Sequence, residues 1–461
     1  MGKLPHRILW LLAGLACSGC AHRPTPVVTP PVATARPAAV KEPKAEPPAP
    51  AAPDDGAVAM KARDTQPAVS DDDLKAQVRG NTAFALDLAA KAPKGNLVFS
   101  PYSLSAALAM AYVGARGHTA EQMRSALHFA LPPEKLHPAF DRLDLALASR
   151  AKAKSWDGKP LDAFQLHIAN ALWADQRLTL RPAFRDTVGA NYGAGLRLLD
   201  FTRRDAVSAT INDWVAKHTD DRIKGIVGPD SITRDTRLVL TNAVYFFAEW
   251  MYAFDKDGTK PAPFTRLDGR KVSVPLMDLT GEFHYAHGDG WQVVELPYEG
   301  REVAFDVLLP ANSRFAGFER GLDAEKLGHI LGDLNYTLIH LRLPRFKFET
   351  SLRLKEALRS LGMSDAFGDA ADLGAMGQFE GDPLYLQHVL HRAVIDVDEK
   401  KTEALAVTAM PSAPGAPGKY VPPKPIEMRA DHPFLFLIRD LPTGQILFWG
   451  RIVDPSAAPA R

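Results

Sequence analysis

Residues that could do chemistry are scattered along this 461-residue chain and do not form a catalytic motif. The fourteen histidines show no metal-ligand spacing, and the H-E-x-x-H, G-x-S-x-G, Walker and G-x-G-x-x-G motifs do not occur. Because a catalytic triad is assembled in space, an unrecognised hydrolase remains one hypothesis. We nevertheless expect a protein that is not an enzyme and that binds no metal and no cofactor.

Cys20 is the residue whose surroundings indicate a specific modification. The run ILWLLAGLA follows a short basic start, is too short to span a bilayer, and indicates a signal peptide over residues 1–20. Its end, CSGC, resembles the lipobox of a bacterial lipoprotein, where the cysteine thiol is lipidated, although Cys17 replaces the usual leucine. We expect an exported protein anchored at the outer membrane or cell surface, a choice favoured by Ala21. The alternative is an ordinary cleaved signal and a secreted or periplasmic protein.

Residues 21–70 are rich in proline and alanine, as in RPTPVVTPPVATARPAAVKEPKAEPPAPAAP. The segment has no apolar period and cannot bury enough surface to order itself. It is predicted to be a disordered tether. In the polyproline conformation, at about 3.1 Å per residue, it would reach on the order of 150 Å from the membrane.

The folded part is expected over residues 71–456, followed by a tail over 457–461. Hydrophobic residues make up 46% of the chain and charged residues 24%, which is typical of a globular protein. The net charge of +1 gives no electrostatic case for a nucleic-acid partner. Both cysteines, Cys17 and Cys20, precede this part, so packing alone must stabilise it.

Apolar periodicity predicts an α+β domain with large sheets. Helices are expected after the N-cap Ser70, from Ser100 and from Ile211. Strands are expected over residues 236–250, 291–298 and 303–310, and in a C-terminal hairpin that turns at Pro442, Thr443 and Gly444.

Five stretches in this order resemble the serpin family. They are NLVFSPYSLSAALAMAYVGARGHTAEQM, TNAVYFFAEWMYAFDKDGTKPAPF, LPRFKFETSLRLKEALRSLGMSDAF, HRAVIDVDEKKTEA and ADHPFLFLIRDLPTGQILFWGRIVDP. The resemblance covers residues 72–455. It implies the serpin fold, with three β-sheets, about nine helices and an exposed reactive-centre loop. It also implies a monomeric inhibitor that acts as a suicide substrate of serine proteases, and of cysteine proteases in some cases.

The resemblance places the reactive loop at about residues 399–422. In serpins a protease cuts this loop, and the cut loop inserts as a new strand of the large sheet. The resemblance implies that Thr402 points inward, and strand alternation then extends an inward row in which no side chain is charged. The inward row from the hinge is Thr402, Ala404, Ala406, Thr408 and Met410, and the outward row is Lys401, Glu403, Leu405 and Val407.

Some loop residues depart from the family pattern. Lys401 stands where the family favours glycine, and Pro411 and Pro414 lack the N–H that a central strand uses. A non-inhibitory serpin-fold protein, with a binding or chaperone-like role, is therefore the alternative function.

Two peptide bonds are candidates for the reactive site. Counting along the usual loop length from the hinge residue Glu399 points to Gly415–Ala416, which would suit an elastase-like or subtilisin-like protease. Counting back from the end of the loop points to Lys419–Tyr420, which would suit a trypsin-like protease.

Several polar residues match the family's sheet-opening switch. Ser100, Ser103, Asn212 and His391 match positions beneath the centre of the large sheet, and Trp250 matches the tryptophan where insertion begins. Asn242 and Tyr245 are interpreted as structural residues.

Overall fold

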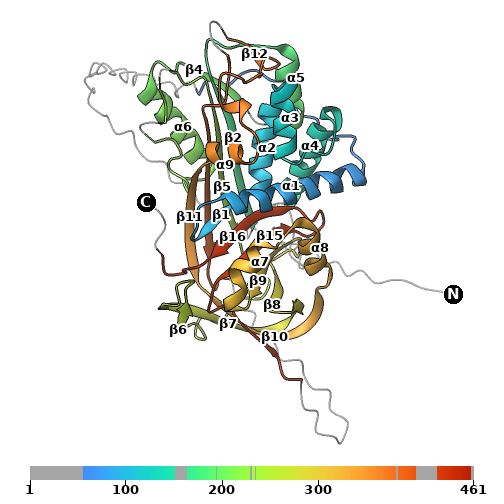
Figure 1. The fold of residues 1–461 in the computed structure, drawn as a ribbon, viewed down its shortest axis with the longest axis vertical. Helices are drawn as coiled ribbons and strands as arrows, with labels where there is room; N and C mark the ends of the chain where they lie inside the picture. Colours follow the sequence, from blue (N-terminus) through green and yellow to red (C-terminus); the bar gives the residue numbers. More distant parts are fainter. Residues whose placement is uncertain are drawn as a thin grey trace, which may run out of the picture. The chain divides into compact units, whose positions relative to one another are not determined.

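The protein is described by a computed structural model (Figure 1). The described residues are 55–150, 164–193, 195–228, 231–233, 235–379, 383–400 and 423–457. They form nine α-helices and three β-sheets, of nine, five and two strands. This mixed architecture confirms the predicted α+β fold class. In these ranges no helix combines the length and the apolar character needed to cross a bilayer. The predicted signal peptide and residues 401–422 of the predicted loop lie outside them.

The five-stranded sheet has the strand order β11-β13-β5-β2-β4. Its two central strands, β13 and β5, run parallel, whereas β11 is antiparallel to β13 and β2 is antiparallel to β5. The strands are β11 (Phe346–Arg353), β13 (His388–Val397), β5 (Leu238–Ala248), β2 (Phe164–Asp175) and β4 (Leu196–Leu199).

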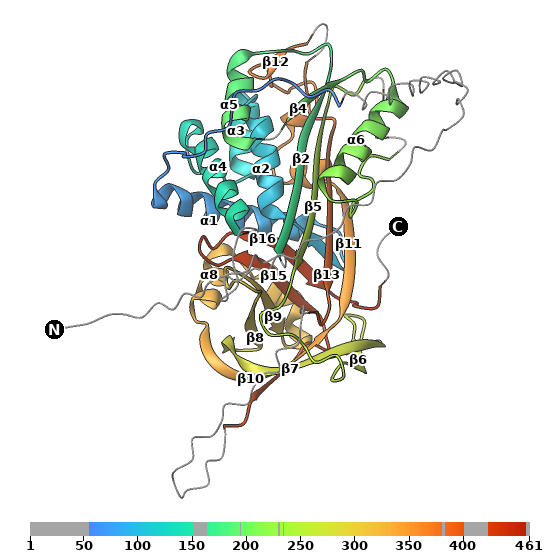
Figure 2. The same cartoon turned by 180° about the vertical axis from the view of Figure 1, so that it is seen from behind.

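Helices pack against both faces of this sheet (Figure 2). Helix α2 (Pro101–Tyr112) is buried along its whole length, and it begins where the Ser100 side chain accepts a hydrogen bond from the Ser103 N–H. Helix α6 (Arg204–His218) covers the opposite face. Alternate residues of β5 join the two cores, since Val244 packs in the core that includes α2 and Tyr245 packs in the core that includes α6.

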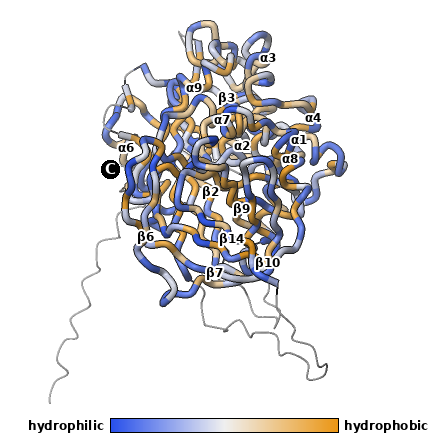
Figure 3. The backbone as a smooth tube through the Cα atoms, turned by 60° about the horizontal axis from the view of Figure 1, so that its bottom comes forward, coloured by the Kyte–Doolittle hydropathy of each residue, from blue (hydrophilic) through white to orange (hydrophobic). Residues whose placement is uncertain are grey.

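The nine-stranded sheet contains the predicted C-terminal hairpin, in which Gly444 adopts a positive φ of 75° at the turn. Strand β9 is buried at every position, and most of its residues are hydrophobic (Figure 3). The sheet order is β1 (Leu97–Phe99), β16 (Ile446–Ile452), β15 (Phe434–Asp440), β9 (Val303–Pro310), β8 (Trp291–Pro297), β7 (Lys271–Gly288), β10 (Asn335–Pro344) and β14 (Ile426–Arg429), with β6 (Lys260–Thr265) paired to β7.

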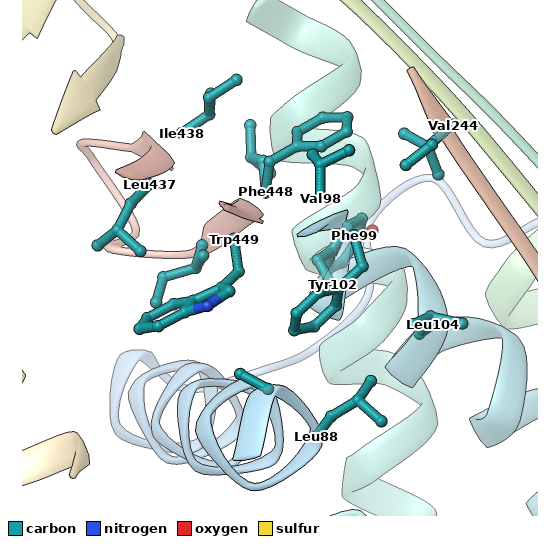
Figure 4. Packing of buried hydrophobic residues seen from close by; sticks show 14 of the residues in the cluster. Leu88, Val98, Phe99, Tyr102, Leu104, Val244, Leu437, Ile438, Phe448 and Trp449 are labelled. Carbon is teal, nitrogen blue, oxygen red and sulfur yellow. The ribbon is translucent and has the colours of Figure 1, made fainter. Parts of the chain in front are cut away.

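The main hydrophobic core joins this sheet to the helices. Figure 4 shows Phe448 and Trp449 of β16 near Phe99 of β1 and Tyr102 of α2. The remaining helices are α1 (Asp71–Lys91), α3 (Gly117–Ala126), α4 (Pro133–Arg150), α5 (Pro182–Tyr192), α7 (Phe315–Arg320), α8 (Ala324–Gly332) and α9 (Lys355–Ser360), with 3-10 turns at Asn312–Arg314 and Asp365–Phe367 and a small sheet of β3 (Thr179–Leu180) and β12 (Gly377–Gln378).

The folded part begins before the residue predicted from the sequence. The tether is expected to continue to residue 70, but Ala57 forms an antiparallel β-bridge with Arg197, and the Asp64 N–H donates to the Ala190 carbonyl at 2.9 Å. Met60 and Val69 also pack against the core. These backbone and apolar contacts order residues 55–69, so the predicted boundary near residue 70 is wrong. A tether over residues 21–54 stays a prediction.

Candidate functional site

The candidate site is the seam between the parallel strands β5 and β13. Their ladder runs from the pair Val239 and His388 to the pair Tyr245 and Val394. Both strands continue for three more residues without pairing to each other, β5 to Ala248 and β13 to Val397. The expected loop leaves directly from this unpaired end, so a strand entering the sheet would separate the ladder from there.

Five polar side chains meet beneath the middle of the seam, and we call them the polar cluster. One row of the sheet supplies three members, because Asn242 of β5 is in register with His391 of β13 and with Asn170 of β2. The other two are Ser100 and Ser103 at the N-terminus of α2. The cluster therefore connects both sides of the seam to the same helix.

The hydrogen bonds of the polar cluster fix the tautomer of His391. Its Nε2 accepts from the Ser100 N–H at 3.3 Å, and its Nδ1 donates to Asn242 Oδ1. Asn242 Nδ2 in turn donates to Ser103 Oγ and to Asn170 Oδ1. Burial lowers the pKa of His391 to about 3, which leaves the ring neutral at physiological pH.

The structure brings three predicted switch residues together, Ser100, Ser103 and His391, and adds two. Asn242 lies at the centre of the polar cluster, and its interpretation as a structural residue stays a prediction. Asn170 carried no prediction. Both occur within apolar strands, in LVLTNAVYFFA and FQLHIANALWAD. A polar residue within such a strand usually has a buried hydrogen-bond partner, and that signal could have identified them.

Asn212 does not join the polar cluster. It lies on α6, on the opposite face of the sheet, where its Oδ1 accepts from the N–H groups of Ile226 and Val227 at 2.8 and 3.0 Å. Its Nδ2 donates to the Val227 carbonyl at 3.0 Å. Asn212 therefore holds the segment that follows α6. The prediction that it lies with Ser100, Ser103 and His391 beneath the centre of the sheet is wrong.

Trp250 and Glu399 hold the start of the loop at the unpaired end of the seam. The Trp250 Nε1–H donates to the Asp398 carbonyl at 2.7 Å, and its ring stacks on Tyr298 at 4.5 Å between centroids. Glu399 Oε1 accepts from Thr259 Oγ1 at 2.8 Å and lies 3.4 Å from Arg345 Nη1. The two contacts fix the residues from which an inserting loop would turn.

A cavity of about 250 Å³ opens beside these residues. Its lining includes Tyr245, Ala248, Trp250, Asp398 and Lys400. The cavity therefore lies where β5 and β13 cease to pair and where a first inserted residue would enter. The other predicted loop positions, from Lys401 and Thr402 to the candidate bonds at Gly415 and Lys419, lie outside the described residues.

Glu399→Ala is expected to loosen this end of the seam. The variant removes the acceptor of Thr259 and the partner of Arg345, at a cost of roughly 1–3 kcal/mol in the free energy of unfolding. Urea unfolding and amide exchange at residues 246–248 measure the two effects. Glu399→Gln is the matched control, because it keeps the Thr259 acceptor. Equal behaviour of Glu399→Ala and the parent protein would show that Glu399 does not hold the loop.

His340 holds β14, the strand that follows the loop. Its Nδ1 lies 2.9 Å from Glu427 of β14 and its Nε2 lies 3.0 Å from Asp278 of β7. Hydrogen bonds to Asp278 and Glu427 raise the pKa of His340. The protonated ring therefore ties an edge strand of four residues to the rest of the nine-stranded sheet.

The contribution of His340 to stability is expected to depend on pH. Because its folded pKa lies above the unfolded value, the contribution is complete below about pH 6.5 and is lost as the pH rises through the raised value. The difference in unfolding free energy between the parent and His340→Gln should thus shrink from pH 6 towards pH 9. A difference that stays constant over this range would contradict the assignment.

Comparisons with known proteins agree with this geometry. The model of a family described as Serpin (serine protease inhibitor) matches residues 79–455. An uncharacterized serpin-like protein of Thermococcus kodakarensis is 39% identical over 78% of this chain and 81% of its own length. Antithrombin-III of Mus musculus is 33% identical over 83% of this chain and 81% of its own length.

Solved structures are similar over most of the chain. The thermophilic serpin tengpin in its native state has a TM-score of 0.74 and 26% identity, covering 86% of this chain and 97% of tengpin. Uncleaved ovalbumin has a TM-score of 0.72 and 26% identity, covering 82% of this chain and all of ovalbumin.

Proposed function

This chain belongs to the serpin family, and from that premise we propose that it inhibits serine endopeptidases as a suicide substrate. Many members of the family inhibit proteases, and serpins are generally not catalysts. The target would cut a bond of the loop over residues 399–422 and become an acyl-enzyme. The freed end of the loop, still attached to β13, would then enter the seam and carry the protease with it.

The parallel pairing of β5 with β13 supports this proposal most strongly. A loop that turns back from the end of β13 runs antiparallel to β13, and therefore also antiparallel to its parallel neighbour β5. Insertion thus replaces one parallel ladder by two antiparallel ones, which are slightly more stable per residue. About a dozen new ladder bonds at roughly 1 kcal/mol each give on the order of 10 kcal/mol to drive the change.

The polar cluster would set when the seam opens. Insertion separates Asn242 from His391, and buried groups left without partners are costly, so the cluster favours the closed sheet until the loop is cut. Ser100 and Ser103 already bond His391 and Asn242 in the closed sheet, so each residue would keep one partner on α2 when the pair separates. This balance supports a closed sheet that opens only when the inserted strand compensates for the separated pair.

A panel of trypsin-like, elastase-like, subtilisin-like and cysteine proteases tests the function. An inhibitor gives a covalent complex that survives SDS and heating, and the mass of the released peptide identifies the bond, Lys419–Tyr420 or Gly415–Ala416. The cut protein should also unfold at a much higher temperature than the intact one. Cleavage by every protease, without any complex or rise in Tm, would exclude inhibition.

A non-inhibitory role is the second candidate, favoured by Lys401, Pro411 and Pro414 in the loop. Each proline removes one ladder donor, so insertion could stop before Pro411. In that case the protein would be a serpin-fold binding or chaperone-like protein, and the panel would give cut protein alone.

We propose further that Cys20 carries a lipid, which would hold the inhibitor at the outer membrane or cell surface. The CSGC end of the predicted signal supports this location. Mass spectrometry of the mature N-terminus tests it, since lipidation predicts a modified Cys20 as the first residue. An unmodified N-terminus at another residue would instead indicate a secreted or periplasmic protein.

A further inference from the structure

Residues 55–69, which we call the strap, precede the part of the chain that the family model matches. The strap runs along β4, α5 and α4 and ends at Ser70, the N-cap of α1. It therefore contacts both the five-stranded sheet and the helices, and each contact has a distinct physical basis.

The first contact extends the five-stranded sheet at β4, its edge strand. The Leu198 N–H donates to the Gly56 carbonyl at 2.9 Å, and the Val58 N–H donates to the Leu196 carbonyl at 3.3 Å. An edge strand otherwise presents unpaired backbone groups to solvent. The strap thus fastens itself to the half of the sheet, β4, β2 and β5, that a strand entering the seam would move away from β13.

The second contact reaches α6 through Arg197 of β4. Asp55 lies 3.3 Å from Arg197 Nη2, and the guanidinium lies 4.6 Å from the centroid of the Trp214 ring. Trp214 belongs to the core beneath α6, which also contains Leu390 and Val394 of β13. This core spans the seam, so Arg197 connects the strap to a part of the molecule that must rearrange when the seam opens.

The third contact uses a surface of α5 that has space only for a backbone. A Cβ added at Gly189 would lie 2.4 Å from the Lys61 carbonyl oxygen, closer than real contacts allow. Nearby, the Asp64 N–H donates to the Ala190 carbonyl at 2.9 Å. The glycine therefore lets the strap lie directly on the helix.

The fourth contact is an ion pair with α4. Arg63 Nη2 lies 2.6 Å from Asp141, which is fully buried, and 2.8 Å from Asp144. Burial raises the pKa of Asp141 to about 6 even though Arg63 acts to lower it. Asp144 also accepts from the Tyr102 hydroxyl at 3.2 Å, and Tyr102 lies on α2 between Ser100 and Ser103 of the polar cluster.

We propose that the strap restrains opening of the five-stranded sheet. It joins β4, on the β5 side of the seam, to α4, whose Asp144 accepts a hydrogen bond from Tyr102 of α2. The start of α2 is bonded in turn to β13, through the Ser100 N–H and His391. Moving β5 and β4 away from β13 would therefore stretch or release this chain of contacts. Release of the strap therefore makes separation of the seam easier in the uncut protein. The consequence for inhibition rests on the proposed function, but the restraint on the sheet does not.

Two variants test the restraint by different routes in the full-length protein. Arg63→Ala removes the ion pair with α4, and Gly189→Ala places a methyl group against the strap backbone. Arg270→Ala is the matched control, because it removes an exposed arginine that pairs with Asp268 at 2.6 Å, away from the strap. Hydrogen exchange of the uncut protein is measured without protease at the strap, at β4 and at residues 239–245 of the seam.

Both variants are expected to accelerate exchange at the seam by ~10-fold or more, which corresponds to about 1.4 kcal/mol, and the control to leave it unchanged. Faster exchange confined to the strap and β4 would overturn the proposal. Because no protease is present, faster seam exchange would support the restraint even if the protease panel yields no complex. If Arg63→Ala does not fold, Gly189→Ala alone tests the restraint, because this variant keeps Arg63 as the partner of the buried Asp141.

Discussion

Thr402→Arg is expected to turn the protein from an inhibitor into an ordinary substrate of its target protease. The resemblance to serpins implies that Thr402 lies in the inward row of an inserted strand, where an arginine would be buried without a partner at a cost of several kcal/mol. Insertion would then stall at its first step, and the acyl-enzyme would hydrolyse. SDS gels should show cut protein in place of the covalent complex, with unchanged stability of the intact form.

Glu403→Arg is the matched control, because the same side chain is introduced one position along, in the outward row. It should still trap the protease, and its cut form should still gain thermal stability. Covalent trapping by Thr402→Arg at the level of this control would contradict the insertion mechanism, since an inward charge would then carry no penalty.

Acidification is expected to weaken the closed sheet through His391. Its folded pKa of about 3 lies below the ordinary 6.5, so between these values the unfolded chain binds a proton that the folded protein excludes. The free energy of unfolding should therefore fall as the pH drops below 6.5, by about 1.4 kcal/mol for each pH unit down to about 3. Urea unfolding at pH 7.5, 5.5 and 4.5 measures the slope.

His391→Gln separates this residue from other acid-sensitive groups. The glutamine amide can replace the hydrogen bonds in part but does not titrate. The unfolding free energy of the variant should therefore fall less steeply with acidification, by about 1.4 kcal/mol per pH unit. Burial also lowers the pKa of His137 to about 4, which adds slope of the same sign, and His137→Gln measures that background. An identical slope in the parent and in His391→Gln would show that His391 is not the group that senses acid.

The sequence predicted those elements whose own residues encode their structure. The buried helix α2 follows from its apolar residues and from Ser100 and Pro101 at its start, and β5 follows from its β-branched run. The strap could not be predicted in this way, because the hydrophobic residues of DGAVAMKARDTQPAV follow neither a helical nor a strand period. Its order depends on partners far along the chain, such as Gly189 and Asp141, and local patterns carry no information on such contacts.

The candidate site was predicted in part for a similar reason. Ser100, Ser103 and His391 were placed together by resemblance, but the resemblance did not reveal which face of the sheet each residue occupies. Asn212 was therefore placed on the wrong face. Asn242 was interpreted as structural, and the sequence did not reveal that its side chain bonds Asn170 of β2 and, across the seam, His391 of β13.

The length of β13 also sets how far a captured protease would travel. Strand β13 has ten residues, and an inserted strand of equal length, at about 3.4 Å per residue, spans roughly 30–35 Å. The new end of the inserted loop would finish where β13 begins, at the far end of the five-stranded sheet. The other cut end would stay attached to β14 of the nine-stranded sheet. The severed bond could not be rejoined across that gap, so each molecule would serve once.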